Sequence, residues 1–118
     1  MILLTSTDSL EVFLDGAVAT NELEWATSWQ DARNGFFESE DNGQGVTAGA
    51  AAVAIVAAPG ASVVRRVGYI SVSNADTARR TVTIDLDVSA TPRQLWTGDL
   101  EVGQTVVYST GAGWQVTP

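Results

Sequence analysis

The stretch YISVSNADTARRTVTIDLDV, residues 69–88, contains two segments in which isoleucine, valine or leucine alternates with polar residues. A period of two is typical of β-strands that bury one face. The polar segment between them contains Asn74 and Asp76, whose side chains can hydrogen-bond to nearby backbone and favour a chain reversal. We therefore predict an antiparallel hairpin over this stretch. Its outward face would carry Thr81, Thr83, Asp85 and Asp87.

The rest of the chain has the same organisation, with short β-rich segments between glycine, proline and asparagine turn signals. This spacing predicts an all-β fold, a small antiparallel β-sandwich that is jelly-roll-like. We expect turns at RNG (33–35), DNGQG (41–45), ATPRQ (90–94) and TGD (97–99). The predicted strands are residues 10–14, 23–29, 52–57, 63–73, 81–88, 94–97 and 104–109.

The segment AGAAAVAIVAA, residues 48–58, is the exception to this pattern because alanine favours a helix. Val53 and Ile55 nevertheless alternate along it, and Gly49 and Pro59 bracket it. We therefore interpret it as a strand.

The residue inventory limits the chemistry that the chain can perform. It contains no cysteine, no histidine and no lysine, and Met1 is the only methionine. These absences remove thiolate and imidazole nucleophiles, imidazole bases, the usual zinc ligands and lysine Schiff bases. We expect a non-enzymatic protein without a cofactor. A disulfide framework is also excluded, so we expect one domain, residues 1–118, held together by its own core or by neighbouring subunits.

The formal net charge of −8 is unevenly distributed. Residues 1–45, an acidic N-terminal part, contain nine acidic residues and one arginine, whereas residues 46–118 contain five of each. This asymmetry argues against nucleic acid as a partner. The acids could dock on a basic protein surface, or they could simply keep the protein soluble.

Two apolar stretches raise the question of targeting or membrane insertion. MILLTSTDSLEVFL, residues 1–14, lacks a basic n-region and a cleavage site, so we expect no signal peptide. The weakly polar run 46–64 is broken by Pro59 and Gly60, so we expect no membrane span. We therefore expect synthesis in the cytoplasm.

Aromatic residues are concentrated in LEWATSWQDARNGFF, residues 23–37. On a strand, Trp25 and Trp29 share one face, and Phe36 and Phe37 follow after a turn. The tryptophans could stack on a sugar, fill the core or form a subunit contact. We favour the core or a subunit contact, because the segment has few amides beside the rings to bind sugar hydroxyls.

Two groups of carboxylates are candidate metal or catalytic sites. Asp85 and Asp87 share a strand face, and ESEDNGQG brings Glu38, Glu40 and Asp41 into a glycine-rich segment. Calcium takes oxygen ligands, but neither group has the ligand spacing of an EF-hand loop. We expect a solvated face and a solvated loop, with no metal. A glycosidase would require two carboxylates across a cleft, and no cleft-forming insertion is evident.

The second half of the chain has a recognisable order of segments. An isoleucine-rich strand that ends in Asn-Ala-Asp is followed by a Thr-Val strand, an apolar strand, a leucine, a glycine, a hydrophobic-tyrosine strand and a closing Gly-Trp-x-Val. These are residues 70–76, 81–86, 95–97, Leu100, Gly103, 107–108 and 113–116. This order resembles that of small virion proteins of tailed bacteriophages. The N-terminal MILLTSTDSLEVFL is similar to the start of such proteins. The resemblance covers about residues 1–30 and 59–116 and departs from the family pattern at 31–50.

This resemblance implies a non-enzymatic building block of the virion, made in the cytoplasm of a host bacterium. We expect a capsid decoration or accessory protein that contacts other virion proteins and forms a homo-oligomer, a trimer. The alternative is a tail, neck or fibre component that could bind carbohydrate. The N-terminal segment would be either the first strand of its own sandwich or an arm exchanged with a neighbour. The candidate interface residues are Leu3, Leu4, Trp25, Trp29, Phe36, Phe37, Glu38, Glu40 and Asp41.

Overall fold

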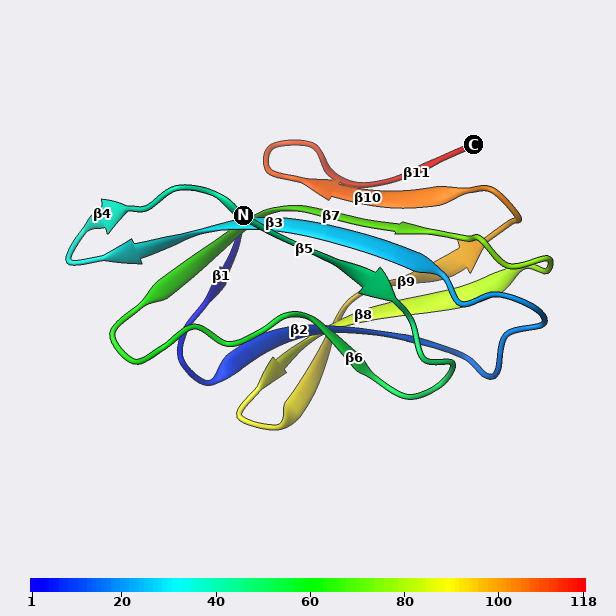
Figure 1. Cartoon of the computed structure of the whole chain (residues 1–118), viewed down its shortest axis with the longest axis horizontal. Helices are drawn as coiled ribbons and strands as arrows, with labels where there is room; N and C mark the ends of the chain where they lie inside the picture. Colours follow the sequence, from blue (N-terminus) through cyan, green and yellow to red (C-terminus); the bar gives the residue numbers. More distant parts are fainter.

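The computed structural model describes all residues, 1–118, and consists of two antiparallel β-sheets (Figure 1). The predicted all-β fold is confirmed, and the arrangement is compatible with a small β-sandwich. No helix of the length and apolarity that a membrane crossing requires is present.

The larger sheet has seven strands in the order β11-β10-β7-β3-β4, with β1 also paired to β7 and β5 also paired to β3. In Figure 1 it is the layer nearer the viewer. Its strands are β1 (Ile2–Leu4), β3 (Glu24–Arg33), β4 (Phe36–Phe37), β5 (Asp41–Val46), β7 (Val64–Ser73), β10 (Thr105–Ser109) and β11 (Gly113–Thr117).

The smaller sheet has four strands in the order β6-β2-β8-β9. They are β2 (Asp8–Leu14), β6 (Val53–Val56), β8 (Arg80–Val88) and β9 (Thr91–Leu100). The alanine-rich segment therefore forms a strand, as its alternation predicts.

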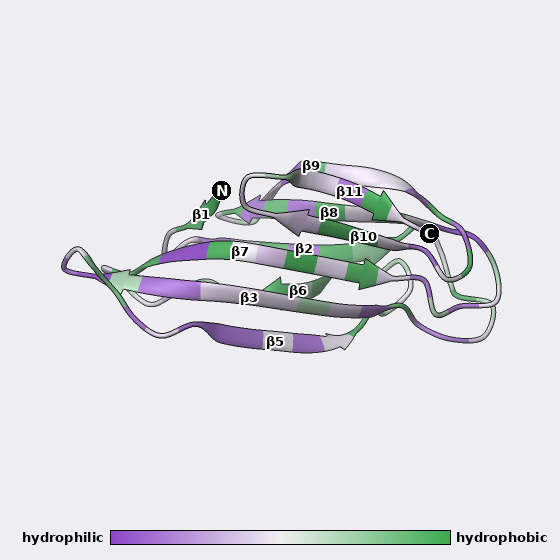
Figure 2. Cartoon of the chain, turned by 90° about the horizontal axis from the view of Figure 1, so that it is seen from above, coloured by the Kyte–Doolittle hydropathy of each residue, from purple (hydrophilic) through white to green (hydrophobic).

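The core lies between the two sheets because alternate residues of each strand point inward. Figure 2 shows this alternation as hydrophobic and hydrophilic bands along β7 and β8, whereas β5 is largely hydrophilic. The largest fully buried side chains are Leu4, Leu10, Leu14, Leu23, Ile70, Ile84 and Leu100. Leu4 is among them, so β1 contributes to the core of its own chain.

The prediction that residues 69–88 form a hairpin is wrong. β7 pairs with β1, β3 and β10, whereas β8 pairs with β2 and β9, so the segment crosses from one sheet to the other. Both strands alternate because each buries one face in the same core, and alternation alone does not show which strands pair.

The crossover is held by two buried polar side chains. Asn74 donates to the backbone carbonyls of Ala78 and Leu100. The Asp76 carboxylate forms an ion pair with Arg80, at 3.0 Å from its Nε. It also accepts four backbone hydrogen bonds of 2.8–3.1 Å, from the N–H groups of Ala19, Thr20, Asn21 and Thr77.

Three of the predicted turns are wrong because the segments are strands. DNGQG forms most of β5, while ATPRQ and TGD lie largely within β9. β5 tolerates its glycines because Gly43 and Gly45 face the indoles of Trp25 and Trp29, which occupy the space that their side chains would need. The turn before β9 is instead formed by Ser89 and Ala90, both with positive φ.

Aromatic residues close the open side of the sandwich between β9 and β11. Trp96 from the smaller sheet stacks on Trp114 from the larger one, with ring centroids 6.1 Å apart and an interplanar angle of 19°. Tyr108 packs against the same indole at 5.0 Å. These contacts join the two sheets through side chains rather than through backbone hydrogen bonds.

Candidate docking surface

The end of β3 and the short strand β4 form a hairpin that extends beyond the sandwich, at the far left of Figure 1. Arg33 pairs with Phe36, and Ala32 pairs with Phe37. The two residues between them, Asn34 and Gly35, have φ values of 50° and 81°. A type I′ turn requires positive φ at both positions, and Asn-Gly is the sequence that adopts it most readily.

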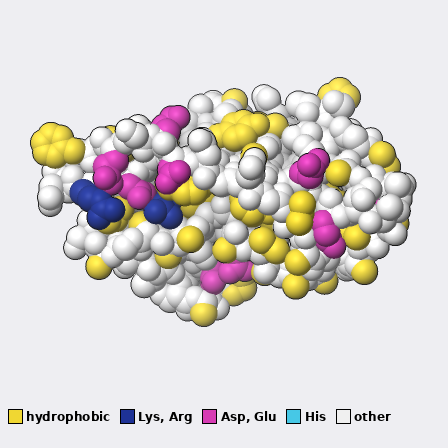
Figure 3. Space-filling view, viewed as in Figure 1, with side chains coloured by type: hydrophobic (Ala, Val, Ile, Leu, Met, Phe, Trp, Pro, Cys, Tyr) yellow, Lys and Arg dark blue, Asp and Glu magenta, His cyan; other side chains and the backbone are white.

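The hairpin exposes two large apolar side chains. Phe36 is 78% exposed and Phe37 is 52% exposed, although β-hairpin aromatics usually pack against a core. In Figure 3 a hydrophobic group protrudes at the same end of the molecule, with acidic and basic side chains gathered beside it. An apolar tip with a charged surround is the arrangement typical of a protein contact site.

Polar contacts hold the hairpin in one conformation. The backbone N–H of Glu38 donates to the carbonyl of Asp31 at 2.8 Å, and the Gln30 amide donates to the carbonyl of Glu38 at 3.1 Å. The Arg33 Nε lies 2.9 Å from the Glu38 carboxylate. The Arg66 guanidinium lies 4.0 Å from the centre of the Phe37 ring, a cation–π contact.

The base of the hairpin is anchored to β7 by Arg65. Its guanidinium donates two hydrogen bonds to the Asp31 carboxylate, at 2.8 and 3.0 Å, and a third to the carbonyl of Ala57. It also lies 5.0 Å from the Trp29 ring centre. The Arg65 hydrogen bonds lower the pKa of Asp31, although partial burial opposes this effect. Because its base is anchored, the hairpin tip projects in a fixed direction.

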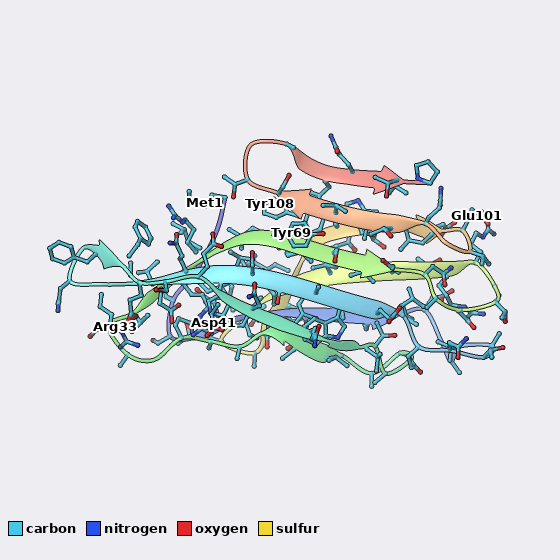
Figure 4. All side chains as sticks on the ribbon, turned by 45° about the horizontal axis from the view of Figure 1, so that its top comes forward. Met1, Arg33, Asp41, Tyr69, Glu101 and Tyr108 are labelled. Carbon is cyan, nitrogen blue, oxygen red and sulfur yellow. The ribbon has the colours of Figure 1, made fainter.

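The acidic residues beside the hairpin belong to different local environments. Glu38 is paired with Arg33, whereas Glu40 and Asp41 are exposed and form no salt bridge. Figure 4 shows Arg33 beside the hairpin and Asp41 at the start of β5. Because Arg65 and Arg66 lie next to this segment, the surface is mixed in charge rather than purely acidic.

The two tryptophans of β3 pack against the core, as the preferred interpretation predicts. An added Cβ at Gly45 would lie 2.8 Å from the Trp25 ring, and one at Gly43 would lie 3.2 Å from the Trp29 ring. Both indoles therefore pack over the glycines of β5, and both remain half-buried.

β1 lies near the base of the hairpin, because Leu3 is in register with Arg66. Leu3 is 52% exposed, whereas Leu4 is fully buried. The prediction that Leu4 is an interface residue is therefore wrong for this structure, since the alternation along β1 points it into the core. The structure thus brings Leu3, Phe36, Phe37, Glu38, Glu40 and Asp41 to one end of the molecule.

A hollow of about 500 Å³ lies on the outer face of the larger sheet, next to the hairpin base. Met1, Gln30, Glu40, Arg66 and Tyr69 are among its lining residues. Figure 4 shows Met1 and Tyr69 on this face. Arg66 and Tyr69 could not be assigned to this site from the sequence, because they join it only through the pairing of β7 with β1 and β3.

No protein-family model, curated protein or solved structure matches this chain.

Proposed function

We propose that this protein is a non-enzymatic structural component of a tailed-phage virion, most simply a capsid decoration or accessory protein. The observation that carries the proposal is the β3–β4 hairpin, which holds Phe36 and Phe37 exposed on a rigid, projecting support. A chain that uses two large aromatics in this way loses favourable burial unless another surface covers them. The resemblance to small virion proteins supports a particle surface as that partner.

Docking would place the two phenyl rings in an apolar depression of the lattice, as anchors of the contact. Burying a phenylalanine side chain contributes about 1.5–3 kcal/mol. Buried aromatic anchors of this kind often dominate the free energy of binding, while the surrounding contacts exclude water. The pre-formed hairpin also reduces the conformational entropy lost on binding.

The charged residues around the rings would set orientation rather than affinity. Glu40 and Asp41 are exposed and unpaired, so they suit a basic lattice surface. Exposed ion pairs contribute about 0–1 kcal/mol each. Raising the salt concentration should therefore weaken docking modestly, whereas removing the phenyl rings should abolish it.

We further propose that the protein associates with its own copies on the particle, as a trimer. The outer edges of β5 and β11 have no strand partner in the chain. Unpaired edges and exposed apolar residues such as Val116 are surfaces that a neighbouring copy could cover.

A second candidate function is carbohydrate binding by a tail, neck or fibre component. The hollow beside the hairpin favours it, because Tyr69 offers an aromatic face next to the amide of Gln30, the carboxylate of Glu40 and the guanidinium of Arg66. Sugars are bound by such combinations of aromatic and planar polar groups. Trp29 also lines this hollow, whereas Trp25 does not.

The copy number in purified virions tests the proposal. A decoration protein should be present in hundreds of copies, and a tail part in a handful. Absence from purified, infectious particles would contradict both assignments. A glycan-binding measurement on the wild type and on Tyr69→Ala separates the second candidate from the first, because only the second predicts binding that this substitution removes.

A further inference from the structure

The outer face of the larger sheet carries a second hollow, of about 590 Å³, further along β3 from the hairpin. Glu24 and Ala26 of β3, Gln44 of β5, and Ser71 and Ser73 of β7 are among its lining residues. None of the contacts that fix the hairpin involves these residues. The second hollow is therefore a feature of the sheet face itself.

The two hollows are neighbours along β3 and β7. In the sheet register Ala26 is opposite Ser71, and both line the second hollow. Ser28 is opposite Tyr69, and both line the hollow beside the hairpin. Residues two apart on a strand share a face, so the hollows follow one another directly along the same two strands. We refer to the two hollows together as the outer-face strip.

Tyr69 is the large side chain at the centre of the outer-face strip. Its cross-strand partners are Ser28 on β3 and Ser109 on β10, and Ser71 is the next residue of β7 on the same face. Because these neighbours are all serines, no bulky cross-strand partner covers the phenol ring. Tyr69 is 39% exposed, and Figure 4 shows it on this face. An accessible aromatic ring of this kind is suited to stack on a sugar ring.

The rest of the outer-face strip offers free hydroxyl and amide groups. The side chains of Ser28, Gln44, Ser71 and Ser109 line it, and none of them forms a hydrogen bond within the chain. A hydroxyl donates and accepts hydrogen bonds, and an amide offers donors and an acceptor. Sugar hydroxyls require partners of both kinds, so these groups match a glycan.

A protein partner would fit the outer-face strip less well. The cores of protein interfaces are enriched in aromatic residues, methionine and arginine and are depleted in serine and alanine. Serine and alanine make up most of the surface around Tyr69. An apolar partner would also bury their hydroxyls without hydrogen bonds, which costs free energy. The composition of the strip therefore favours a sugar chain over a protein surface.

The charges of the outer-face strip indicate which sugar chains it accepts. The charged side chains that line the two hollows are Glu24 at one end, and Glu40 and Arg66 at the other. Arg66 already donates to the Gln30 amide oxygen and lies over the Phe37 ring. The chain as a whole has a formal net charge of −8. An anionic polysaccharide would be repelled, so the strip suits a neutral one.

We propose that the outer-face strip binds a linear, neutral polysaccharide, with Tyr69 stacked on a sugar ring near the centre of the contact. From Glu24 to Gln30 the strip is about 20 Å long, at about 3.3 Å per residue. A disaccharide is shorter than this, so several consecutive sugar units are bound. The proposal rests on the carbohydrate binding that we propose above as a second candidate function. It adds the second hollow, the extended form of the ligand and its lack of charge.

Isothermal titration calorimetry of the purified protein tests the extended contact. The probes are neutral linear hexasaccharides, namely cellohexaose, chitohexaose, maltohexaose and mannohexaose, and the disaccharide of each series. We expect at least one hexasaccharide to bind roughly tenfold or more tightly than its disaccharide, because only the longer chain reaches both hollows. Binding of none of these hexasaccharides would overturn the proposal. Equal affinity for a hexasaccharide and its disaccharide would also overturn it, although carbohydrate binding in one hollow would survive.

Variants of the two hollows locate the contact. Tyr69→Ala should weaken hexasaccharide binding roughly tenfold, whereas Tyr69→Phe keeps the ring and should bind as the wild type does. Gln44→Ala should weaken hexasaccharide binding roughly threefold and leave disaccharide binding at Tyr69 unchanged. Gln115→Ala is the matched control, since Gln115 is exposed on β11 and lines neither hollow.

Circular dichroism establishes that each variant remains folded. Wild-type affinity of folded Tyr69→Ala for the hexasaccharide would contradict stacking on this ring. An anionic probe, hexagalacturonic acid, tests the charge argument, and tighter binding of this probe than of every neutral hexasaccharide would contradict the assignment of a neutral ligand.

The same variants separate this proposal from docking through the hairpin. Phe36 and Phe37 line neither hollow, so Tyr69→Ala and Gln44→Ala should be retained on particles as the wild type is. Failure to bind any glycan would leave docking unaffected. A protein that binds a hexasaccharide but is not retained on particles would contradict docking alone.

Discussion

The sandwich and its β3–β4 hairpin use apolar side chains in opposite ways. In the sandwich, Leu4, Leu23 and Ile70 are fully buried between the sheets. In the hairpin, Phe36 and Phe37 are exposed even though a strand pairing and several polar contacts support them. The sandwich therefore gains stability from its apolar residues, whereas the hairpin leaves its own exposed.

This difference is the reason that we place the proposed contact at the hairpin. Contacts that complete the fold leave nothing for a partner to add, as at Asp76, where the N–H groups of four residues and Arg80 surround the carboxylate. Other contacts hold an apolar group that stays exposed. The hairpin is the clearest example of the second kind.

The largest effect that separates the two regions is expected at β1. Leu4→Ala should lower the free energy of unfolding by about 2–5 kcal/mol, because it leaves a cavity in the core. Leu3→Ala should change it by less than about 0.5 kcal/mol, because Leu3 is exposed. Urea denaturation measures both. Equal effects of the two substitutions would mean that β1 does not pair with its own β7.

The next largest effect is expected at the edge strand β5. Gly45→Ala places a Cβ 2.8 Å from the Trp25 ring and should cost about 1–3 kcal/mol. Gly60→Ala is the control, since nothing lies within 4 Å of its added Cβ. Thermal unfolding compares the two. An unchanged melting temperature for Gly45→Ala would show that β5 does not cover the indole.

Two buried aspartates, Asp76 and Asp85, should make the free energy of unfolding depend on pH in opposite directions. Burial raises the pKa of Asp76, but its backbone hydrogen bonds outweigh this and hold the pKa well below its usual range. Its contribution to stability is thus present above the unfolded pKa, near 4, and is lost as the pH falls. The pKa of Asp85 is raised, so its contribution is present at acid pH and is lost as the pH rises.

Urea denaturation across a pH series checks these directions. Asp76→Asn should flatten the loss of stability in acid. Asp85→Asn should instead leave stability at neutral pH equal to or slightly above that of the wild type, because it removes an unpaired buried charge. Marked destabilisation by Asp85→Asn at neutral pH would contradict the absence of a partner for this carboxylate.

Local patterns in the sequence predict the fold class well. Strand alternation identified seven of the eleven strands, and Asn34–Gly35 marked the hairpin turn. The pairing of strands could not be predicted in this way, because alternation is the same whichever sheet receives a strand. β5 was missed because its glycines signal a turn locally, while the tryptophans that favour a strand there lie on β3.

Only part of the candidate site could be predicted, because local sequence patterns do not show which strands pair. Phe36, Phe37 and the nearby acids are close in sequence and could be identified together. The arginines that support them, Arg65 and Arg66, come from β7, about thirty residues away, and only the sheet register brings them to the hairpin. Asp85 was expected on a solvated face, but it is only 7% exposed, although the strand alternation points it away from the core.

The smallest effect on stability is expected for the hairpin tip itself. Phe36→Ala/Phe37→Ala should change the free energy of unfolding by less than about 1 kcal/mol, since little beyond the cation–π contact with Arg66 is lost. Chemical denaturation measures this change. A loss as large as that expected for Leu4→Ala would place the two rings in the core.

Retention of the purified protein on the phage particle that we propose as its partner tests the central claim most directly. Particles that lack the protein are mixed with the wild type, with Phe36→Ala/Phe37→Ala, or with the control Val102→Ala, which removes an exposed apolar side chain elsewhere. Co-sedimentation then measures binding. We predict that the wild type and the control bind and that the hairpin variant, although folded, does not. Wild-type retention of the hairpin variant would contradict docking through Phe36 and Phe37.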